Sequence, residues 1–162
     1  MLLLLNRHAH AGTRDPGQWP DDRDRPLTEK GRAVQADVSR FLRKRDLAPS
    51  LVLTSPWARA RQTAEILVEV ARVPQPPVPC EPLAEDPDLV RLQDYVGDQP
   101  TGAIVAMVGH SPWMEELASI LLGGSGTSVQ IDFPKSGALG IALERLEPGA
   151  GELRFFIRPK MA

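Results

Sequence analysis

The chain of 162 residues carries 19 Lys and Arg against 21 Asp and Glu, a formal net charge of −2. This length suits one domain, expected to span residues 1–162, and is enough to bury a sizeable core. The near balance of charge gives no basis for binding nucleic acid or a membrane surface. Cys80 is the only cysteine, so the sequence predicts neither a disulfide framework nor a cysteine metal cluster, and it favours a cytoplasmic protein.

The first part of the chain predicts two strand–helix pairs. The continuous apolar run at residues 2–5 predicts a short buried strand and is too short for a signal-peptide core or a membrane span. Residues 11–26 are rich in Gly, Pro and charged side chains and predict a loop. Thr28 is then placed to cap a helix whose apolar residues recur at helical spacing. Residues 51–53 predict a second strand, and Ser55 is expected to be the N-cap of the next helix.

The middle of the chain continues this alternation. Residues 74–87 contain many prolines and predict an extended connection with a short edge strand near Val78. Residues 88–96 predict a modest helix. Residues 103–108 form the clearest buried strand, after which Ser111 is expected to cap another helix.

The last elements predict an antiparallel hairpin. Glycines at residues 123–126 are expected to close the preceding helix, and strands follow at residues 139–143 and 153–157. Strands that alternate with helices imply a three-layer α/β/α sandwich with a mainly parallel sheet. In such folds a ligand lies beyond the carboxyl ends of the strands.

Polar residues follow several of these predicted strands. His8, His10 and His110 are the only histidines, and each lies within a few residues of the end of a strand. Arg7 precedes His8, and Arg59 lies in the first turn of the helix after the second strand. Each of these residues alone has an ordinary structural interpretation. Their expected convergence at one edge of the sheet favours an oxyanion site, above all one for phosphate.

The same residues carry a family resemblance. Arg7-His8-Ala9 resembles the Arg-His-Gly signature of the histidine phosphatase superfamily, which includes the phosphoglycerate mutases, with Ala9 in place of glycine. Residues 55–64 (SPWARARQTA) and Val108-Gly109-His110 match its second and third motifs, and residues 26–31 resemble the helix start between them. The short chain and residues 24–28 (DRPLT) resemble the SixA-type phosphohistidine phosphatases.

This resemblance implies a phosphoglycerate mutase-like fold and a phosphatase. His8 would attack phosphorus and form a phosphohistidine intermediate, which water then hydrolyses. Arg7, Arg59 and a protonated His110 would hold the nonbridging phosphate oxygens. Glu85 resembles the general acid of phosphoester-cleaving members, but it could equally be a solvated loop carboxylate.

The expected partner is a phosphorylated protein, such as a histidine phosphotransfer domain, or a small phosphorylated metabolite. A small-molecule phosphomonoesterase or mutase is the main alternative, and a catalytically idle phosphate-binding module is a third. Specificity is expected to depend on three walls of the site, at residues 11–26, 74–87 and 123–136.

The spacing His8-x-His10 also permits a metal site, completed by a carboxylate of the first loop (Asp15, Asp22 or Asp24). The sequence contains no second metal-ligand motif, and a metal would leave the two arginines unexplained. We therefore expect neither a metal nor a cofactor, with His10 at the rim of the pocket.

Overall fold

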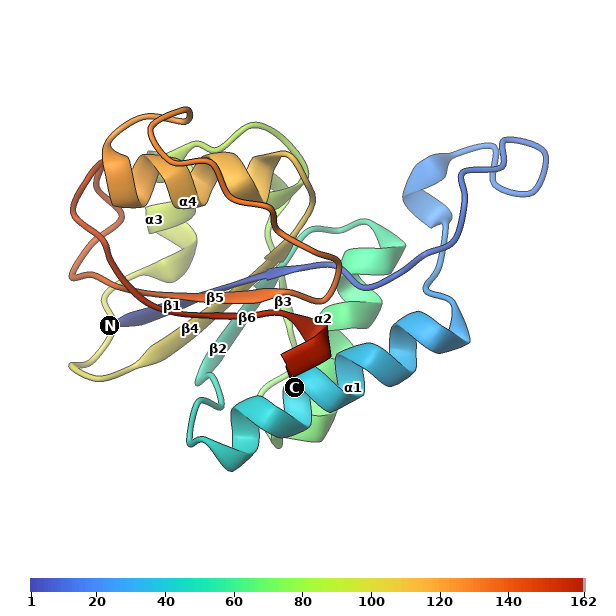
Figure 1. The fold of residues 1–162 in the computed structure, drawn as a ribbon, viewed down its shortest axis with the longest axis horizontal. Coiled ribbons are helices and arrows are strands. Elements are labelled where there is room, and N and C mark those ends of the chain that lie inside the picture. The colour runs from blue at the N-terminus through green and yellow to red at the C-terminus, as the bar shows by residue number, and fades with distance from the viewer. Residues whose placement is uncertain (162) are drawn as a thin grey trace.

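A computed structural model describes residues 1–161 and contains a six-stranded sheet between two layers of helices (Figure 1). The strands are β1 (Leu2–Arg7), β2 (Leu51–Thr54), β3 (Val78–Pro79), β4 (Ile104–Gly109), β5 (Ala138–Ala142) and β6 (Glu152–Ile157). The α-helices are α1 (Glu29–Lys44), α2 (Ala58–Ala71), α3 (Leu89–Val96) and α4 (Trp113–Gly123). Short 3-10 helices lie at Asp22–Asp24, Glu81–Ala84 and Pro159–Met161. The predicted α/β/α sandwich is confirmed.

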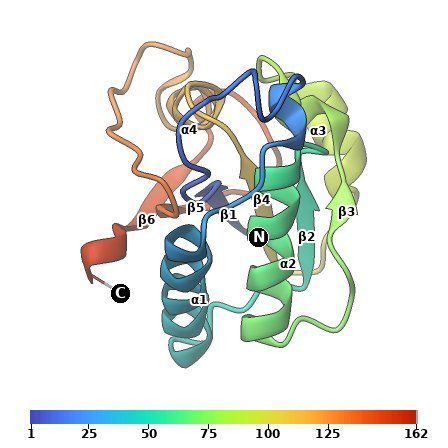
Figure 2. The ribbon, with the colours of Figure 1, turned by 90° about the vertical axis from the view of Figure 1, so that its right-hand side faces the viewer.

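The sheet brings the ends of three strands together. Its order is β3-β2-β4-β1-β5-β6, and β1, β2, β3 and β4 are parallel to one another. Arg7 at the end of β1 pairs with Gly109 of β4, while Thr54 at the end of β2 pairs with Val108. The three strands therefore end level with one another, and the residues that follow them share one edge of the sheet. In Figure 2 the arrowhead of β2 points up toward this edge.

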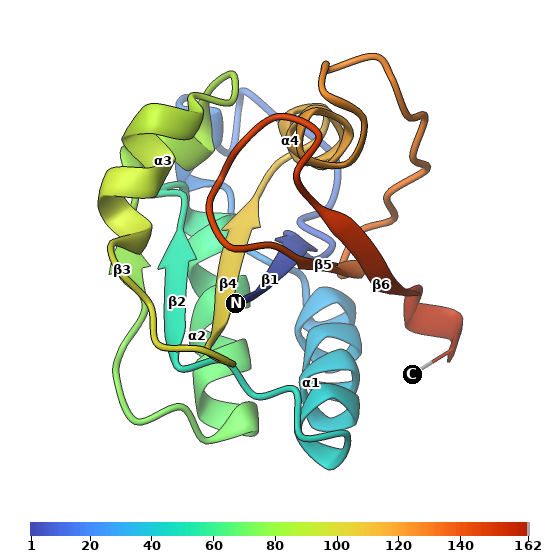
Figure 3. The ribbon, with the colours of Figure 1, turned by 90° about the vertical axis from the view of Figure 1, so that its left-hand side faces the viewer.

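Each face of the sheet has its own apolar core. Leu3 and Leu5 of β1 are buried in the cluster that also contains residues of α3 and α4, whereas Leu4 is buried in the cluster formed with α1 and α2. Successive side chains of a strand point to opposite faces, so an unbroken leucine run suits a strand covered on both sides. Figure 3 shows this division, with α1 and α2 on one face and α3 and α4 on the other.

The first turn of α1 packs directly on the chain that leaves β1. Thr28 caps the helix as predicted, because its Oγ1 accepts a hydrogen bond from the Gly31 backbone N–H at 3.0 Å. A Cβ at Gly31 would lie 2.2 Å from the His10 carbonyl oxygen, so this position requires glycine. Leu27 N–H donates to Gln62 Oε1 at 2.8 Å, which joins this segment to α2. The helix start therefore holds the residues after β1 in position.

Two predicted helix caps are wrong. The helices begin later, at Ala58 and Trp113, with Trp57 and Pro112 at the capping positions. Ser55 instead continues the sheet, since its N–H donates to the Val108 carbonyl at 2.9 Å. Its hydroxyl lies 2.8 Å from His110 Nε2, and the hydroxyl of Ser111 donates to Glu115 Oε1 at 2.7 Å. Both hydroxyls are thus engaged by other side chains.

The last strands form the predicted hairpin. β5 is antiparallel to both β1 and β6, and β6 is an edge of the sheet. Gly124, with φ 89°, adopts the left-handed conformation that ends α4, as expected for its glycine-rich terminus. Among the described residues, no helix is long and apolar enough to cross a membrane.

Candidate active site

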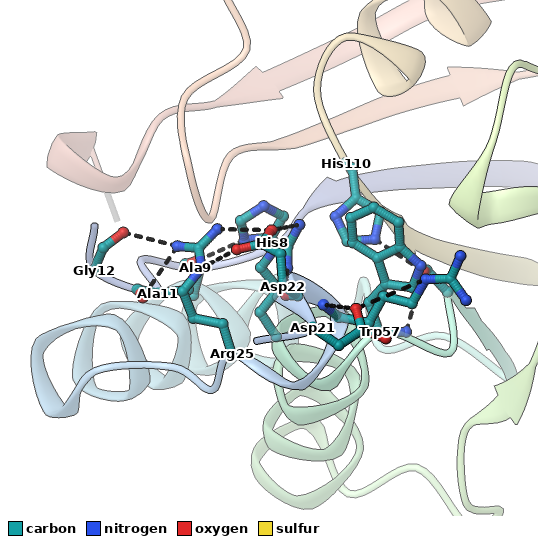
Figure 4. Close-up of polar contacts among 12 residues, drawn as sticks. His8, Ala9, Ala11, Gly12, Asp21, Asp22, Arg25, Trp57 and His110 are labelled. Atoms are coloured by element: carbon teal, nitrogen blue, oxygen red, sulfur yellow. Dashed lines mark hydrogen bonds and ion pairs between the residues drawn. The ribbon is translucent and has the colours of Figure 1, made fainter. Parts of the chain in front are cut away.

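Because the strands end level with one another, His8 and His110 come into contact. His8 N–H donates to the Gly109 carbonyl at 2.9 Å, so the residue after β1 continues the pairing with β4. The rings of His8 and His110 have centroids 5.1 Å apart (Figure 4), and their residues are 7% and 3% exposed. The sequence motifs, 102 residues apart (110 − 8), therefore meet at the carboxyl edge of the sheet.

The backbone fixes which nitrogen of His8 is free to react. His8 Nδ1 lies 2.7 Å from the Ala9 carbonyl oxygen, which can only accept a hydrogen bond. In the neutral ring Nδ1 therefore carries the proton, and the lone pair is on Nε2. Burial lowers the pKa of His8 from 6.5 to about 3, and the charges of Arg59 and Arg7 act in the same direction. His8 is thus a neutral imidazole at ordinary pH, with the lone pair of Nε2 unprotonated.

His110 is held by Ser55 and by an aromatic neighbour. Its Nε2 lies 2.8 Å from Ser55 Oγ, and its ring centroid lies 4.5 Å from that of Trp57. Burial lowers the pKa of His110 to about 2, and the neighbouring His8 and Arg59 add to this effect. His110 is therefore neutral in the phosphate-free site, while the expected protonated ring concerns the site with phosphate bound. A bound phosphate dianion would favour the protonated form by supplying the opposite charge.

Arg59 projects from the first turn of α2 into the same cluster. Its guanidinium carbon lies 4.6 Å from the Trp57 ring centroid, a distance typical of a cation–π contact. Nη1 donates to the Asp22 carbonyl at 2.8 Å, and Nη2 lies 3.3 Å from Asp22 Oδ2. The late start of α2 does not remove Arg59 from the site, because residue 59 still lies in its first turn.

Asp22 belongs to the loop over the site, which forms a 3-10 turn that the sequence did not predict. Arg25 Nε donates to Asp22 Oδ1 at 2.8 Å, and this bond lowers the pKa of the Asp22 carboxyl. Arg25 also donates to the carbonyl oxygens of Ala11 and Gly12, as Figure 4 shows. The loop is thus folded around Arg25 and tied to Arg59 through Asp22.

Arg7 reaches the site from the end of β1. Its Nη1 donates to the Phe133 carbonyl at 2.6 Å and lies 3.9 Å from Glu115 Oε1. The Glu115 carboxylate also accepts the Ser111 hydroxyl. Arg7 is therefore fixed between α4 and the segment before β5.

Several buried nitrogens of the cluster lack a partner. Arg7 Nε, Arg59 Nε and His110 Nδ1 make no hydrogen bond within the described part of the chain. Buried polar atoms in proteins are nearly always paired, so such a group requires a specific reason. An oxyanion with several acceptor oxygens would satisfy all three. The donor set fits phosphate in particular, because it combines guanidinium and imidazole nitrogens.

Glu85 lies in a cleft beside this cluster. The cleft has a volume of about 440 Å³ and is lined by Trp57 together with mostly exposed, charged residues: Asp21, Arg23, Asp24, Glu81 and Glu85. Glu85 Oε1 lies 2.5 Å from Arg91 Nη1. Glu85 thus lines the same cleft as Trp57, and its carboxylate is engaged by Arg91 of α3.

The alternative metal site does not form. His10 is exposed, and its Nδ1 lies 3.1 Å from Thr28 Oγ1 and accepts from the Gly12 N–H at 3.3 Å. The Asp22 carboxylate is instead paired with Arg25 and Arg59. Residues 1–161 contain no group of three or more His, Cys, Asp or Glu side chains placed to hold a metal ion.

Sequence reasoning missed three residues that shape the site. Ser55 was assigned to a helix cap and Asp22 to a possible metal site, and no role at the site was assigned to Trp57. Ser55 and Trp57 both carried a signal, because they lie inside the motif at residues 55–64. The roles of Ser55 and Asp22 depend on partners 55 and 37 residues away.

Comparison with known proteins gives the family. The model of the histidine phosphatase superfamily (branch 1) matches residues 3–86. An uncharacterized protein of Picosynechococcus sp. is 34% identical over 143 residues, which cover 87% of this chain and 84% of that protein.

Solved structures share the whole fold. A structure of the protein histidine phosphatase SixA complexed with tungstate has a TM-score of 0.83 at 23% identity, covering 99% of this chain and 98% of that chain. A protein of Agrobacterium tumefaciens assigned as phosphohistidine phosphatase SixA has a TM-score of 0.76 at 26% identity, covering 98% and 97%. A phosphoserine phosphatase mutant of Entamoeba histolytica has a TM-score of 0.67 at 14% identity, covering 99% and 98%. The fold is the phosphoglycerate mutase-like fold that the sequence predicted, and the chain belongs to the histidine phosphatase superfamily (branch 1), a superfamily of phosphatases.

Proposed function

We propose that this phosphatase works through a phosphohistidine on His8 and that its substrate is phosphohistidine in a protein. The observation that carries the first part is the contact of His8 Nδ1 with the Ala9 carbonyl at 2.7 Å. That contact leaves Nε2 as the nucleophile, in a buried site with two arginines. A catalytically idle binding module would not need the reactive tautomer to be selected.

The reaction has two displacements. His8 Nε2 forms a bond to phosphorus as the bond from phosphorus to the leaving group breaks. Water then attacks phosphorus, the P–N bond breaks, and phosphate and neutral His8 are released. The unpaired nitrogens of Arg7, Arg59 and His110 would donate to the nonbridging oxygens and stabilise their charge in both transition states.

The carboxylates around the site support phosphohistidine as the substrate. Asp22 is bound to Arg25 and Arg59, Glu115 lies against Arg7, and Glu85 is paired with Arg91. An ion pair with a guanidinium requires the deprotonated carboxylate, whereas a general acid must carry a proton. An alkoxide leaving group needs that proton, but the P–N bond of phosphohistidine breaks without a strong external acid.

The walls of the site support a protein as the carrier of the phosphoryl group. The cleft beside Trp57 is bordered largely by exposed side chains, including Asp21, Asp24 and Glu81. A mutase would need a more enclosed pocket to retain its intermediate. The likeness to the SixA structures, one of them solved with the oxyanion tungstate, agrees with this choice. A small-molecule phosphomonoesterase is the alternative, because a cleft of about 440 Å³ would also hold a small leaving group.

The first experiment tests the nucleophile. We expect His8→Asn to abolish turnover of a phosphohistidine protein and of an aryl phosphate. The wild-type chain, quenched in alkali during turnover, should carry a phosphoryl group on His8 by mass spectrometry. Near-normal turnover by His8→Asn would rule out this mechanism.

The second experiment tests the leaving group. Glu85→Gln and the wild-type chain are compared on a phosphohistidine protein, an aryl phosphate and an alkyl phosphate. Glu65→Gln is the control, because Glu65 is also an exposed carboxylate paired with an arginine, 3.8 Å from Arg61. We expect kcat/KM to be highest for the phosphohistidine protein and unchanged by Glu85→Gln. A selective loss with the alkyl ester, by about 10²–10⁴-fold, would identify Glu85 as a general acid and favour the phosphomonoesterase.

A further inference from the structure

The segment before β5, residues 133–137, is hydrogen-bonded directly to Arg7 and His8. Ser136 N–H donates to the carbonyl oxygens of Arg7 and His8 at 3.1 and 3.3 Å, and Arg7 N–H donates to the Gly137 carbonyl at 3.1 Å. At the other end of the segment, the Phe133 carbonyl accepts from Arg7 Nη1. Both ends of the segment that contains Lys135 are therefore held by hydrogen bonds to Arg7 and His8.

The backbone of this segment is held in an uncommon conformation. Ser136 has φ 60°, in the left-handed region that residues other than glycine rarely adopt. The residue is 1% exposed, and its hydroxyl is buried without a hydrogen-bond partner among the described residues. Such strain persists only where the surrounding contacts impose it, and it concentrates at ligand sites.

Lys135 adds a cation where cations already gather. Lys135 is exposed at the surface; partial desolvation lowers its pKa, and the charges of Arg7, Arg25 and Arg59 act in the same direction. The charge of Lys135 in turn contributes to lowering the pKa of His8. Among the described residues, Lys135 forms no ion pair with a carboxylate. In contrast, Arg25 and Arg59 pair with Asp22, and Arg7 pairs with Glu115.

The charges that face one another here do not cancel. Arg7, Arg25, Arg59 and Lys135 supply four positive charges against the two negative charges of Asp22 and Glu115. These six groups therefore leave a net positive charge that would attract a phosphate dianion. Like charges at one place repel one another, so a bound anion would stabilise their convergence.

We propose that Lys135 is a phosphate-binding residue, whose ammonium group contacts the phosphoryl group at His8 beside Arg7 and Arg59. This inference rests on the proposed function, since it adds a ligand to the same phosphate site. Lys135 lies in the segment 123–136, which was expected from the sequence to control specificity. Because its neighbour Ser136 is bonded to the backbone of Arg7 and His8, we assign Lys135 to the phosphoryl group instead.

The test measures binding of inorganic phosphate, which contains no carrier group. Dissociation constants are obtained by calorimetry and, independently, from competitive inhibition of aryl phosphate turnover. We expect Lys135→Met to weaken phosphate binding by about ten-fold or more, the loss typical of a hydrogen bond between charged groups. Lys135→Arg should restore much of the affinity, because it keeps the positive charge.

Lys44→Met is the matched control, because Lys44 is an exposed lysine at the far end of α1. It should bind phosphate as the wild type does, and thermal unfolding should find all variants folded. Unchanged phosphate affinity in Lys135→Met would overturn the inference, even if turnover of a phosphohistidine protein fell, because the lysine would then contact the carrier. If Lys135→Met weakens phosphate binding but His8→Asn retains turnover, the proposed mechanism fails while Lys135 remains a phosphate-binding residue.

Discussion

Ser55 should be required for both the stability and the activity of the site. Ser55 is fully buried, and its Oγ lies 2.8 Å from His110 Nε2. Because His110 Nδ1 already lacks a partner among the described residues, Ser55→Ala would leave the whole imidazole without a hydrogen bond. Leaving a buried polar atom unpaired costs about 1–3 kcal/mol, so we expect the free energy of unfolding to fall by about this amount.

The same change should slow the reaction. Without Ser55 Oγ the His110 ring is held only by packing against His8, Trp57 and Trp113, so its orientation toward a bound phosphate is less well fixed. We expect kcat/KM for an aryl phosphate to fall by about 10–100-fold, the equivalent of about 1.4–2.7 kcal/mol of transition-state stabilisation. Unfolding is followed in urea, and turnover is measured under native conditions on the same preparations.

Ser50 provides the control at the opposite end of β2. It is exposed, and its hydroxyl donates to the Ile104 carbonyl at 3.1 Å. Ser50→Ala should change stability by no more than about 0.5 kcal/mol and leave turnover intact. The reasoning is refuted if Ser55→Ala matches Ser50→Ala in both measurements.

Two further predictions concern pH and the first turn of α1. Folding lowers the pKa of His8 from 6.5 to about 3 and that of His110 from 6.5 to about 2. Below pH 6.5 the unfolded chain therefore binds protons that the folded chain does not. The free energy of unfolding should fall as the pH drops from 6.5 toward 3. Urea titrations should find a shallower fall in His110→Asn, and an equally steep one would contradict the assignment. Gly31→Ala should destabilise the fold by about 1–3 kcal/mol, because the new Cβ would lie 2.2 Å from the His10 carbonyl. Helix propensity alone would stabilise by about 1 kcal/mol, so thermal denaturation that detects stabilisation would refute the close approach.

Much of the fold follows from local sequence patterns. The leucine run of β1 predicts a strand buried on both faces, and the structure divides Leu4 from Leu3 and Leu5 between the two cores. Thr28 predicts the start of α1, because a hydroxyl that can cap is followed at once by a helical apolar pattern. The convergence of His8 and His110 was also predictable, since parallel strands end at the same edge.

Other features depend on partners that are distant in the chain, so local patterns could not reveal them. Ser55 has the sequence context of an N-cap, yet its hydroxyl binds a histidine that only strand register brings beside it. Asp22 resembles any loop carboxylate until Arg59 is positioned next to it. The protonation of His110 likewise depends on burial and on the charges that surround it, neither of which is encoded by its motif.

The sequence alone thus determined most of the strands and helices, the family and the cluster of Arg7, His8, Arg59 and His110, because each depends on residue types at fixed spacings. Only the tertiary structure decided which nitrogen of His8 is free, which carboxylates are already paired and why Lys135 belongs with the arginines. Those properties arise from hydrogen bonds, burial and charge between segments that meet only when the sheet has formed.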